Sequence, residues 1–360
     1  GTNFRITTWG ETHGAGVGVV VDGCPAGLPL EREDVQKYLD RRKPGQSKYT
    51  TQRKEGDQVE ILSGIFEGRT TGTPISMVVY NKDQRSKDYS NIKDIYRPGH
   101  ADFTFDMKYG FRDYRGGGRS SGRETIGRVA AGAVAAKVLK ELGIEIKAYA
   151  KAIAGIEVSK DHFDFAEMNN NPFNMPDKEA AKLVQEKADQ MIKEMDSIGG
   201  IIECQITGMP VGIGETVFDK LDAELSKAIM SIGSVKGFEI GDGFEAANLR
   251  GSENNDDFIC VDGKVEKETN HSGGVLGGMS DGSAIVFRAA IKPTPSIAQT
   301  QKTVNRDLDN VEIEIHGRHD PMIVPRAVVV VESMAAVTIL DGVLKNLGAT
   351  MDNIKKIYGE

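Results

Sequence analysis

The stretch RPGHADFTFDMKYGFRDYRGGGRSSGRETIGR, residues 97–128, concentrates positive charge in a chain that is acidic overall. It holds six arginines, one lysine and one histidine against four acidic residues, whereas the 360-residue chain has a formal net charge of -8. A glycine triplet at 116–118 leads to Ser121 and Glu124, whose spacing is that of a capping box. An alanine-rich run follows as far as Gly143, a typical helix stop. The stretch therefore predicts a flexible turn, a helix capped by Ser121, and an end before Gly143.

A helix start of this kind is suited to bind a phosphate. Its free backbone N–H groups and the helix dipole attract anions, and the arginines add charge. The same pattern also fits a solvated helix face beside an ordinary loop. No Gly-Lys-Ser/Thr follows the glycines and the dinucleotide fingerprint is absent, so neither of those motifs explains the stretch. On spacing alone, both an anion site and a plain surface loop stay open.

The composition is that of a globular protein, with 39% apolar and 27% charged residues. The negative net charge argues against a general nucleic-acid binder. Three separate cysteines without a CxxC pair are typical of reduced, structural residues in a cytosolic protein. No apolar run reaches the roughly 20 residues of a membrane helix, and no secretory signal is visible. Glycine at position 1 indicates a processed or engineered start.

Strands and helices alternate from end to end without a linker-like segment, which predicts one large α/β domain over residues 1–360. Apolar spacing and turn residues predict the elements. Strands are expected at 4–9, 14–23, 58–66, 74–80, 144–158, 201–206, 284–291 and 311–315. Further helices are expected at 30–42, 177–196, 221–232 and 325–347, with a strand also possible over 328–331. Residues 160–176 and 237–255 are expected to form loops.

Two histidines and a second basic segment lie in predicted loops. His13 follows a strand within GETHG, where a side chain can face a cleft, although a structural role is the alternative. His100 lies in the loop RPGH just ahead of the arginine-rich helix start. The basic segment runs from Arg41 to Lys54 and is broken by Pro44-Gly45, so it is a loop. A surface loop without function is the simpler interpretation of most of its charges.

Several longer strings in the chain resemble the signature regions of the chorismate synthase family. They are GETHG at 10–14, GGRSSGRETIGRVAAGAV at 117–134 and GRHDP at 317–321. Shorter strings fit the same family: RRKPG at 41–45, YTTQR at 49–53, RPGHAD at 97–102, YRGGGRSS at 114–121 and KPTPS at 292–296. The resemblance covers essentially the whole chain in the family's order and spacing.

The resemblance implies both a fold and an activity. The implied fold is of α+β type, a β-α-β sandwich of antiparallel sheets with flanking helices. The implied reaction converts 5-enolpyruvylshikimate-3-phosphate to chorismate by loss of phosphate and a proton in an anti-1,4-elimination. It requires reduced FMN without net redox change, because an electron-rich flavin can assist an elimination that a simple base cannot. A cytoplasmic homotetramer is also implied. The compact length favours dependence on an external flavin reductase over reduction of the flavin by the chain's own use of NADPH.

The resemblance also assigns roles to residues. His13 would protonate or stabilise the reduced flavin, His100 would act as the acid for the leaving phosphate, and Asp320 would relay the proton taken up at flavin N5. Arg42 and Lys48 match positions for NADP and substrate, although Lys48 replaces an arginine found in relatives and loses its bidentate geometry. The FMN-binding positions are Arg119, Ser120, Ser121, Gly233, Ser234, Gly277, Lys292, Pro293, Thr294, Pro295, Ser296 and Arg318. No metal is implied.

Arg123 is added from the residues themselves, as a contact for the substrate anions. The substrate carries two carboxylates and a phosphate, and FMN carries a further phosphate. Arginine suits such planar anions because it binds them as a bidentate fork. This requirement accounts for the excess of arginine in the central stretch.

Two other functions are weighed against this one. A flavin-dependent oxidoreductase of a small anionic substrate would use similar phosphate contacts, but it would oxidise its flavin stoichiometrically. An RNA-binding module built on RGGGR would need interleaved aromatic residues for base stacking, and it conflicts with the net charge. Filter binding with a salt titration distinguishes that possibility.

Overall fold

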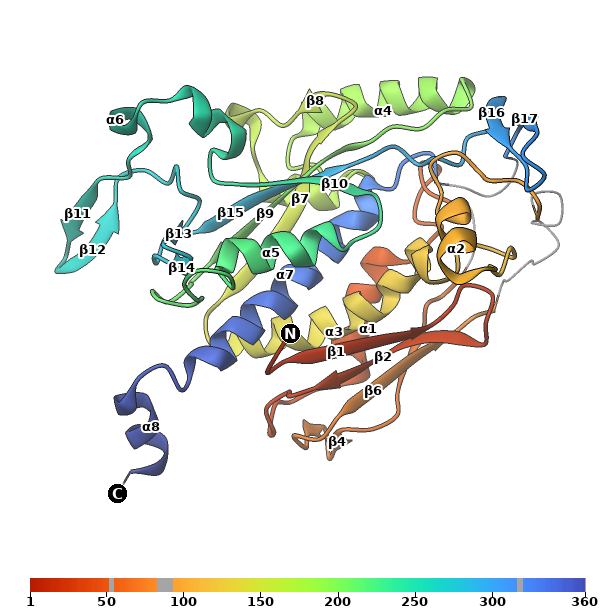
Figure 1. Ribbon diagram of the computed structural model, residues 1–360. Coiled ribbons are helices and arrows are strands. Elements are labelled where there is room, and N and C mark those ends of the chain that lie inside the picture. Colours follow the sequence, from red (N-terminus) through yellow and green to blue (C-terminus); the bar gives the residue numbers. More distant parts are fainter. Residues whose placement is uncertain (52–54, 83–92, 316–319, 360) are drawn as a thin grey trace.

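Two antiparallel sheets enclose a layer of long helices (Figure 1). The computed structural model describes residues 1–51, 55–82, 93–315 and 320–359. Buried apolar side chains from both sheets and from the helices between them form one continuous cluster. The predicted fold class, an α+β sandwich of antiparallel sheets with helices, is confirmed.

The first sheet has the strand order β1-β2-β6-β3, with every neighbouring pair antiparallel. Alternate valines of β2, Val17, Val19 and Val21, are at most 1% exposed and face the helices. The turn between β1 and β2 carries His13. The strands are β1 (Arg5–Gly10), β2 (Gly16–Asp22), β3 (Val59–Ile61) and β6 (Ile75–Tyr80).

The second sheet has the strand order β10-β15-β9-β7-β8 and is also antiparallel. Its inner face contributes Ile202, Cys204 and Phe287, all fully buried. β15 ends where the segment 292–296 begins, so this sheet sets the position of that segment. The strands are β7 (Glu145–Ile153), β8 (Ile156–Glu157), β9 (Gly200–Thr207), β10 (Val235–Ile240) and β15 (Ile285–Ile291).

The helical layer between the sheets is built on two helices that pack closely, α3 and α7. α3 also contacts the first sheet and α7 the second, so the pair joins both halves of the sandwich. α1 packs on α3, and α5 packs on α7 and β10. The helices are α1 (Arg32–Arg42), α3 (Thr125–Glu141), α5 (Leu221–Met230) and α7 (Val324–Asn346).

Within the described residues, α7 is the one helix long and apolar enough to cross a membrane, and most of it is buried in the protein. The expectation that no unbroken apolar run reaches about 20 residues still holds, because α7 is apolar on average and not throughout. Glu332 and Asp341 interrupt the apolar run in the sequence. Both are buried with partners: Glu332 binds Arg41 through two hydrogen bonds, and Asp341 accepts from the N–H groups of residues 2–4. The helix is also continuous through 328–331, where the sequence allows a strand.

The remaining elements lie at the edges of the sandwich. α4 packs near β8, and its first turn is capped by Asp177, whose carboxylate accepts from two backbone N–H groups. α8 extends away from the body and has no buried residue (Figure 1). The helices are α2 (Asp102–Tyr109), α4 (Lys178–Lys193), α6 (Gly251–Asn254) and α8 (Met351–Tyr358). The hairpins are β4 (Ile65–Phe66) with β5 (Arg69–Thr70), β11 (Phe258–Val261) with β12 (Lys264–Lys267), β13 (Val275–Leu276) with β14 (Met279–Ser280), and β16 (Gln301–Val304) with β17 (Asn310–Ile313).

Most predicted elements are confirmed, and the differences have local causes. The expected loop at 237–255 begins as strand β10, because pairing with β15 outweighs the glycine content. The expected strand at 144–158 is broken between β7 and β8 by Ala154 and Gly155, both at positive φ. The expected strand at 58–66 is divided into β3 and β4. All three cysteines are free, as predicted.

Candidate active site

Segments from the beginning, middle and end of the chain meet at one end of the sandwich, beside α2 in Figure 1. They are the β1–β2 turn with His13, the loop 97–100, the turn 116–124, the segment 292–296 and the residues around Asp320. Each is a connection between core elements, so the rigid sheets and helices determine where its side chains lie.

His13 lies against the glycine turn. A Cβ atom at position 116 would be 2.7 Å from His13 Cδ2, so only glycine allows this approach. Arg119 ties the same turn to the end of β1, because its Nη1 donates to Gly10 O at 2.9 Å and its Nη2 to Thr8 O at 3.1 Å. The Ser120 hydroxyl donates to Gly117 O at 2.6 Å. The structure thus brings His13, Arg119 and Ser120 together.

The predicted capping box is wrong. Ser121 Oγ accepts from Arg123 N at 3.2 Å and caps a short 3₁₀ turn, and α3 begins only at Thr125. The Glu124 carboxylate points elsewhere, accepting from Thr8 Oγ1 at 2.7 Å and from Arg128 Nε at 2.9 Å. Glu124 therefore holds α3 against β1 through Thr8, and this contact, together with the one to Arg128 on the same helix, replaces the capping contact.

Arg42 and Arg123 lie on opposite sides of one buried carboxylate. Arg42 Nη1 donates to Asp57 Oδ2 at 2.8 Å, and Arg123 Nη1 donates to Asp57 Oδ1 at 2.9 Å. Arg42 is further held by Thr125 Oγ1 and by Gly122 O. Burial, and next the charge of Arg326, lower the pKa of Arg42 to about 10, while the charge of Asp57 raises it. The two predicted substrate-binding arginines thus form one unit.

Asp320 is held from two sides. Its Oδ1 accepts from Thr51 N at 2.8 Å, and its Oδ2 accepts from Arg326 Nη1 at 2.7 Å. Arg326 Nε donates to Arg42 O at 3.0 Å, which connects Asp320 to the arginine pair. The predicted flavin contact Arg318 lies outside the described residues.

His100 contacts the segment 292–296. Its Nδ1 is 2.9 Å from Pro98 O, and its Nε2 is 2.9 Å from Ser296 Oγ. Because a carbonyl oxygen can only accept, Nδ1 carries the proton and Nε2 accepts from the serine in the neutral ring. Burial, and next the charge of Arg97, lower the pKa of His100 to about 4. His100 is therefore neutral near neutral pH.

The predicted flavin segment 292–296 is fixed by its neighbours. Lys292 N donates to Ser234 O at 2.9 Å, which places Gly233 and Ser234 beside it. Lys292 Nζ donates to Gly99 O at 2.9 Å, joining the segment to the His100 loop. Ser197 Oγ donates to Thr294 O at 2.6 Å. Thr294 Oγ1 is buried and has no hydrogen-bond partner among the residues that the structure describes.

Two predicted site residues, Lys48 and Gly277, make their contacts away from the arginine pair and His100. Lys48 Nζ pairs with Asp189 on α4 at 2.8 Å, where the lysine side chain is exposed and the aspartate side chain is half-buried. Gly277 forms the turn of the β13–β14 hairpin at positive φ, at the other end of β15 from the segment 292–296. Neither contacts the arginine pair or His100 in any described hydrogen bond or ion pair.

The arginines of the central stretch are largely occupied by internal partners. Arg97 binds Asp102 through Nε at 2.7 Å and Nη2 at 2.8 Å, and Arg112 Nη1 donates to Asp106 Oδ2 at 2.9 Å. Arg115 pairs with Asp113. The need to match substrate charge therefore explains only part of the arginine excess, because a buried guanidinium requires a partner of its own.

Sequence reasoning missed Asp57, Arg326 and Glu55. Glu55 Oε2 lies 2.7 Å from Arg123 Nη2. Asp57 and Glu55 carry no local signal, because an acidic residue at the end of a basic loop has the same appearance as a solvated one. Arg326 carries none either, because a single arginine in the first turn of a helix has the same appearance as a surface residue. Tertiary contact alone reveals them.

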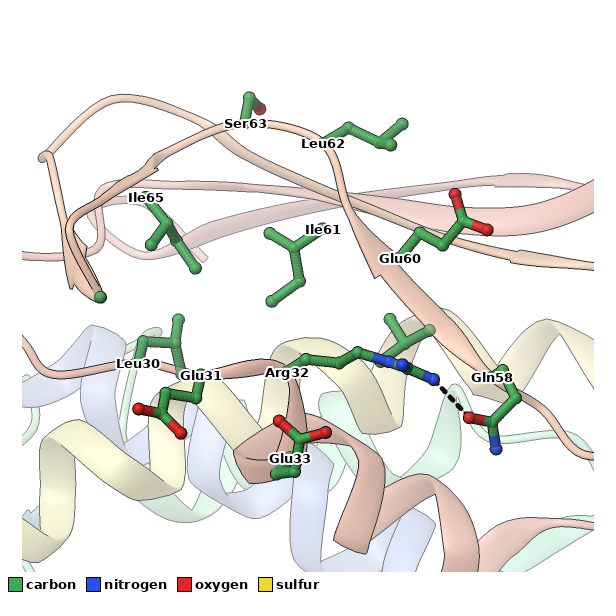
Figure 2. A pocket seen from close by; sticks show the side chains of 12 residues that line it. Leu30, Glu31, Arg32, Glu33, Gln58, Glu60, Ile61, Leu62, Ser63 and Ile65 are labelled. Atoms are coloured by element: carbon green, nitrogen blue, oxygen red, sulfur yellow. Dashed lines mark hydrogen bonds between the residues drawn. The ribbon is translucent and has the colours of Figure 1, made fainter.

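A groove of about 750 Å³ lies away from these residues, between the start of α1 and the edge strand β3 (Figure 2). Glu31, Glu33 and Glu60 line it, together with Arg32, which is bonded to Gln58. Its carboxylates make it a poor site for a multiply charged anion. Among the described residues, no group of His, Cys, Asp and Glu side chains is arranged to hold a metal ion.

The fold and the site define the class: an enzyme of α+β sandwich architecture whose site combines arginine, histidine and carboxylate side chains. A family model described as chorismate synthase matches residues 4–344. The chain is 67% identical to a chorismate synthase of Lachnospira eligens over 358 residues, covering 99% of this chain and 98% of that one. It is 65% identical to one of Agathobacter rectalis, with the same coverage. A crystal structure of chorismate synthase superposes with a TM-score of 0.77 at 31% identity, covering 98% of this chain and 95% of the other.

The chain therefore belongs to the chorismate synthase family, and it is a lyase.

Proposed function

We propose that the chain catalyses the anti-1,4-elimination of phosphate and a proton from 5-enolpyruvylshikimate-3-phosphate, giving chorismate with reduced FMN and no net redox change. The observation that carries the proposal is the convergence of His13, His100 and Asp320 with the arginine pair at one end of the sandwich. An acid, a base and buried cations are what the loss of a phosphate and a proton requires.

The residues at this end fit FMN. Thr294 Oγ1 is a buried hydroxyl without a described partner, in the segment that the family pattern assigns to flavin. Lys292, Ser296, Arg119 and Ser120 would hold the cofactor with it. The bound reduced flavin would supply electron density as the phosphate leaves. The roles of Arg318 and Gly277 in binding FMN, and of Arg42 and Lys48 in binding NADP, stay predictions.

Each catalytic side chain has a task that its surroundings support. His13, against the glycine turn, holds a proton near the cofactor. Asp320, oriented by Thr51 and Arg326, would relay the proton taken up at flavin N5. His100 donates to the leaving phosphate. Because its pKa is about 4 without ligand, this role requires the charge of the bound phosphate to raise that pKa.

The further assignments belong to the same proposal. One continuous apolar cluster supports residues 1–360 as a single domain. We propose a cytoplasmic homotetramer that receives its reduced flavin from an external reductase, with the chain's own NADPH use as the alternative. A nucleic-acid or membrane partner is not part of the proposal.

The first test is an anaerobic assay with chemically reduced FMN and the substrate, following phosphate release and chorismate absorbance. Product formation supports the proposal. A second assay supplies NADPH and oxidised FMN. Product in that assay as well would reveal a built-in flavin reductase, and its absence would indicate an external reductant.

A folded, FMN-binding protein that gives no product with reduced flavin would refute the proposal. Flavin oxidised in stoichiometric amounts on addition of substrate would favour the alternative, an oxidoreductase of a small anionic substrate.

A further inference from the structure

Asp57 is a buried carboxylate that no motif of the chain singled out. Its side chain is 0% exposed, and it lies where the basic loop returns to the first sheet, two residues before β3. Its backbone φ is 42°, in the left-handed region that few residues other than glycine adopt. Aspartate tolerates this conformation better than most residues. Strained backbone of this kind is commonly found where a side chain must be held in place.

The two oxygens of Asp57 are divided between two guanidinium groups. Oδ2 accepts from Arg42 Nη1 at 2.8 Å, and Oδ1 accepts from Arg123 Nη1 at 2.9 Å. Each oxygen therefore sets the position of one arginine, and the carboxylate sets the spacing between them. The backbone is anchored as well, since Gln36 Nε2 on α1 donates to Asp57 O at 3.2 Å.

The charges around Arg42 require this anion. Arg326 and Arg123 repel Arg42, whereas Asp57 and Asp320 attract it. Two buried guanidinium groups without a carboxylate between them would repel each other and separate, because arginine keeps its charge in proteins. Each guanidinium has five N–H groups. Arg42 uses three of them on Asp57, Thr125 and Gly122 O. Arg123 donates to Asp57 and Asn81 and pairs through Nη2 with Glu55, so only the remaining N–H groups of each arginine can bind an anion.

We propose that Asp57 is a positioning residue that orients Arg42 and Arg123 for the carboxylates and phosphate of the substrate. This inference rests on the proposed function, since it takes the two arginines as substrate contacts. Asp57 itself does not touch the reacting atoms. It acts through the arginines, in the way that a second layer of partners fixes the geometry of a binding site.

The test substitutes Asp57→Asn, which keeps the size of the side chain and the tolerance of positive φ but removes the charge. We expect the KM for 5-enolpyruvylshikimate-3-phosphate to rise at least about tenfold, while kcat changes less, because binding common to ground and transition states is lost. The affinity for FMN, measured by fluorescence quenching, should stay within about twofold, because the flavin segment does not contact Asp57.

The matched control is Asp341→Asn. Asp341 is also a buried carboxylate, and it accepts from the backbone N–H groups of residues 2–4, far along the chain from the arginine pair. We expect this variant to lose stability without a change in KM. If Asp57→Asn does the same, the role of Asp57 is merely structural and the inference is wrong.

Asp57→Glu provides a second variant if the asparagine protein does not fold. This variant keeps the charge but displaces the carboxylate, so we again expect a raised KM with unchanged FMN affinity. If Asp57→Glu has the same KM as the unmodified enzyme, the inference is wrong. The proposed function is tested separately, with the unmodified protein. If the unmodified protein gives no product in the reduced-FMN assay, the proposed function is wrong, and a substitution at Asp57 cannot be the cause.

Discussion

The ring nitrogens of His100 contact the carbonyl of Pro98 and the hydroxyl of Ser296, in a half-buried position near the charge of Arg97. These surroundings favour the neutral ring, so the folded protein binds a proton at His100 less readily than the unfolded chain does. The pKa falls from its ordinary value of 6.5 to about 4 in the folded state.

This shift predicts a loss of stability in acid. Between the two pKa values the unfolded chain binds more protons, so the free energy of unfolding falls as the pH decreases through that window. The contribution of His100 should cost about 1–2 kcal/mol between about pH 7 and about pH 5. Urea unfolding of the unmodified protein and of His100→Gln at both pH values measures it. An equal loss in the two proteins would contradict the assignment.

Asp320 is argued to handle a proton, and Asp320→Asn tests that role. The amide keeps the shape and can still accept from Thr51, but it cannot accept a proton. We expect turnover to fall by about two to four orders of magnitude while FMN and substrate still bind. Single-turnover kinetics with reduced FMN, together with direct binding measurements, separate the two effects. Turnover unchanged from the parent would remove Asp320 from the mechanism.

At the scale of elements, the sandwich depends on how closely α3 approaches α7. Gly132 on α3 faces Ser333 on α7, and a Cβ atom at position 132 would lie 2.2 Å from Ser333 Cβ and 2.5 Å from Ser333 Cα. Contact with a backbone atom at this distance cannot be relieved by rotating a side chain. Glycine is therefore required here by packing, although it weakens the helix by about 1 kcal/mol relative to alanine.

Gly132→Ala should therefore destabilise the protein in spite of its better helix propensity. We expect a net loss of at least about 2 kcal/mol in the free energy of unfolding, because the two helices must separate. Gly251→Ala is the control, since Gly251 begins α6 and a Cβ atom there would meet no described atom within 4 Å. Denaturant unfolding of both variants provides the comparison. If Gly132→Ala is more stable than the unmodified protein, the contact between α3 and α7 can accommodate a methyl group and the argument is wrong.

At the scale of the whole molecule, apolar side chains are left exposed at the C-terminal end. Met351, Ile357 and Tyr358 on α8 are 63%, 58% and 84% exposed, and α8 lies apart from the body of the protein (Figure 1). Exposed apolar side chains on an amphipathic helix are typical of a surface that another chain covers. This feature is compatible with the homotetramer that we propose.

Sedimentation equilibrium tests the tetramer directly. We expect a mass four times that of one chain, because association would cover exposed apolar surface that the single chain leaves in water. The same measurement on a protein shortened after Leu347 shows whether α8 takes part. A mass of one chain for the full-length protein, at all concentrations measured, would contradict the tetramer.

Local patterns predicted most of the elements. The glycine-flanked apolar run of β2 and the amphipathic pattern of α4 are signals that neighbouring residues carry, and the structure confirms both elements. Local patterns did not predict β10, which begins the glycine-rich stretch 237–255 and is held as a strand by its pairing with β15. The same limit applies to Ser121 and Glu124, whose spacing fits a capping box although Thr8 and Arg128 bind the carboxylate.

By itself, the sequence determined the family, the alternation of strands and helices, and the loop positions of His13 and His100. Long motifs and apolar periodicity are properties of neighbouring residues, so they can be recognised without coordinates. The tertiary structure decided which charged side chains form ion pairs and hydrogen bonds with one another. Asp57 lies between Arg42 and Arg123, 15 and 66 residues away along the chain, and Arg326 reaches Asp320 and Arg42 together. Such pairings depend on how the two sheets and α3 bring distant segments into contact, and no local pattern encodes that arrangement.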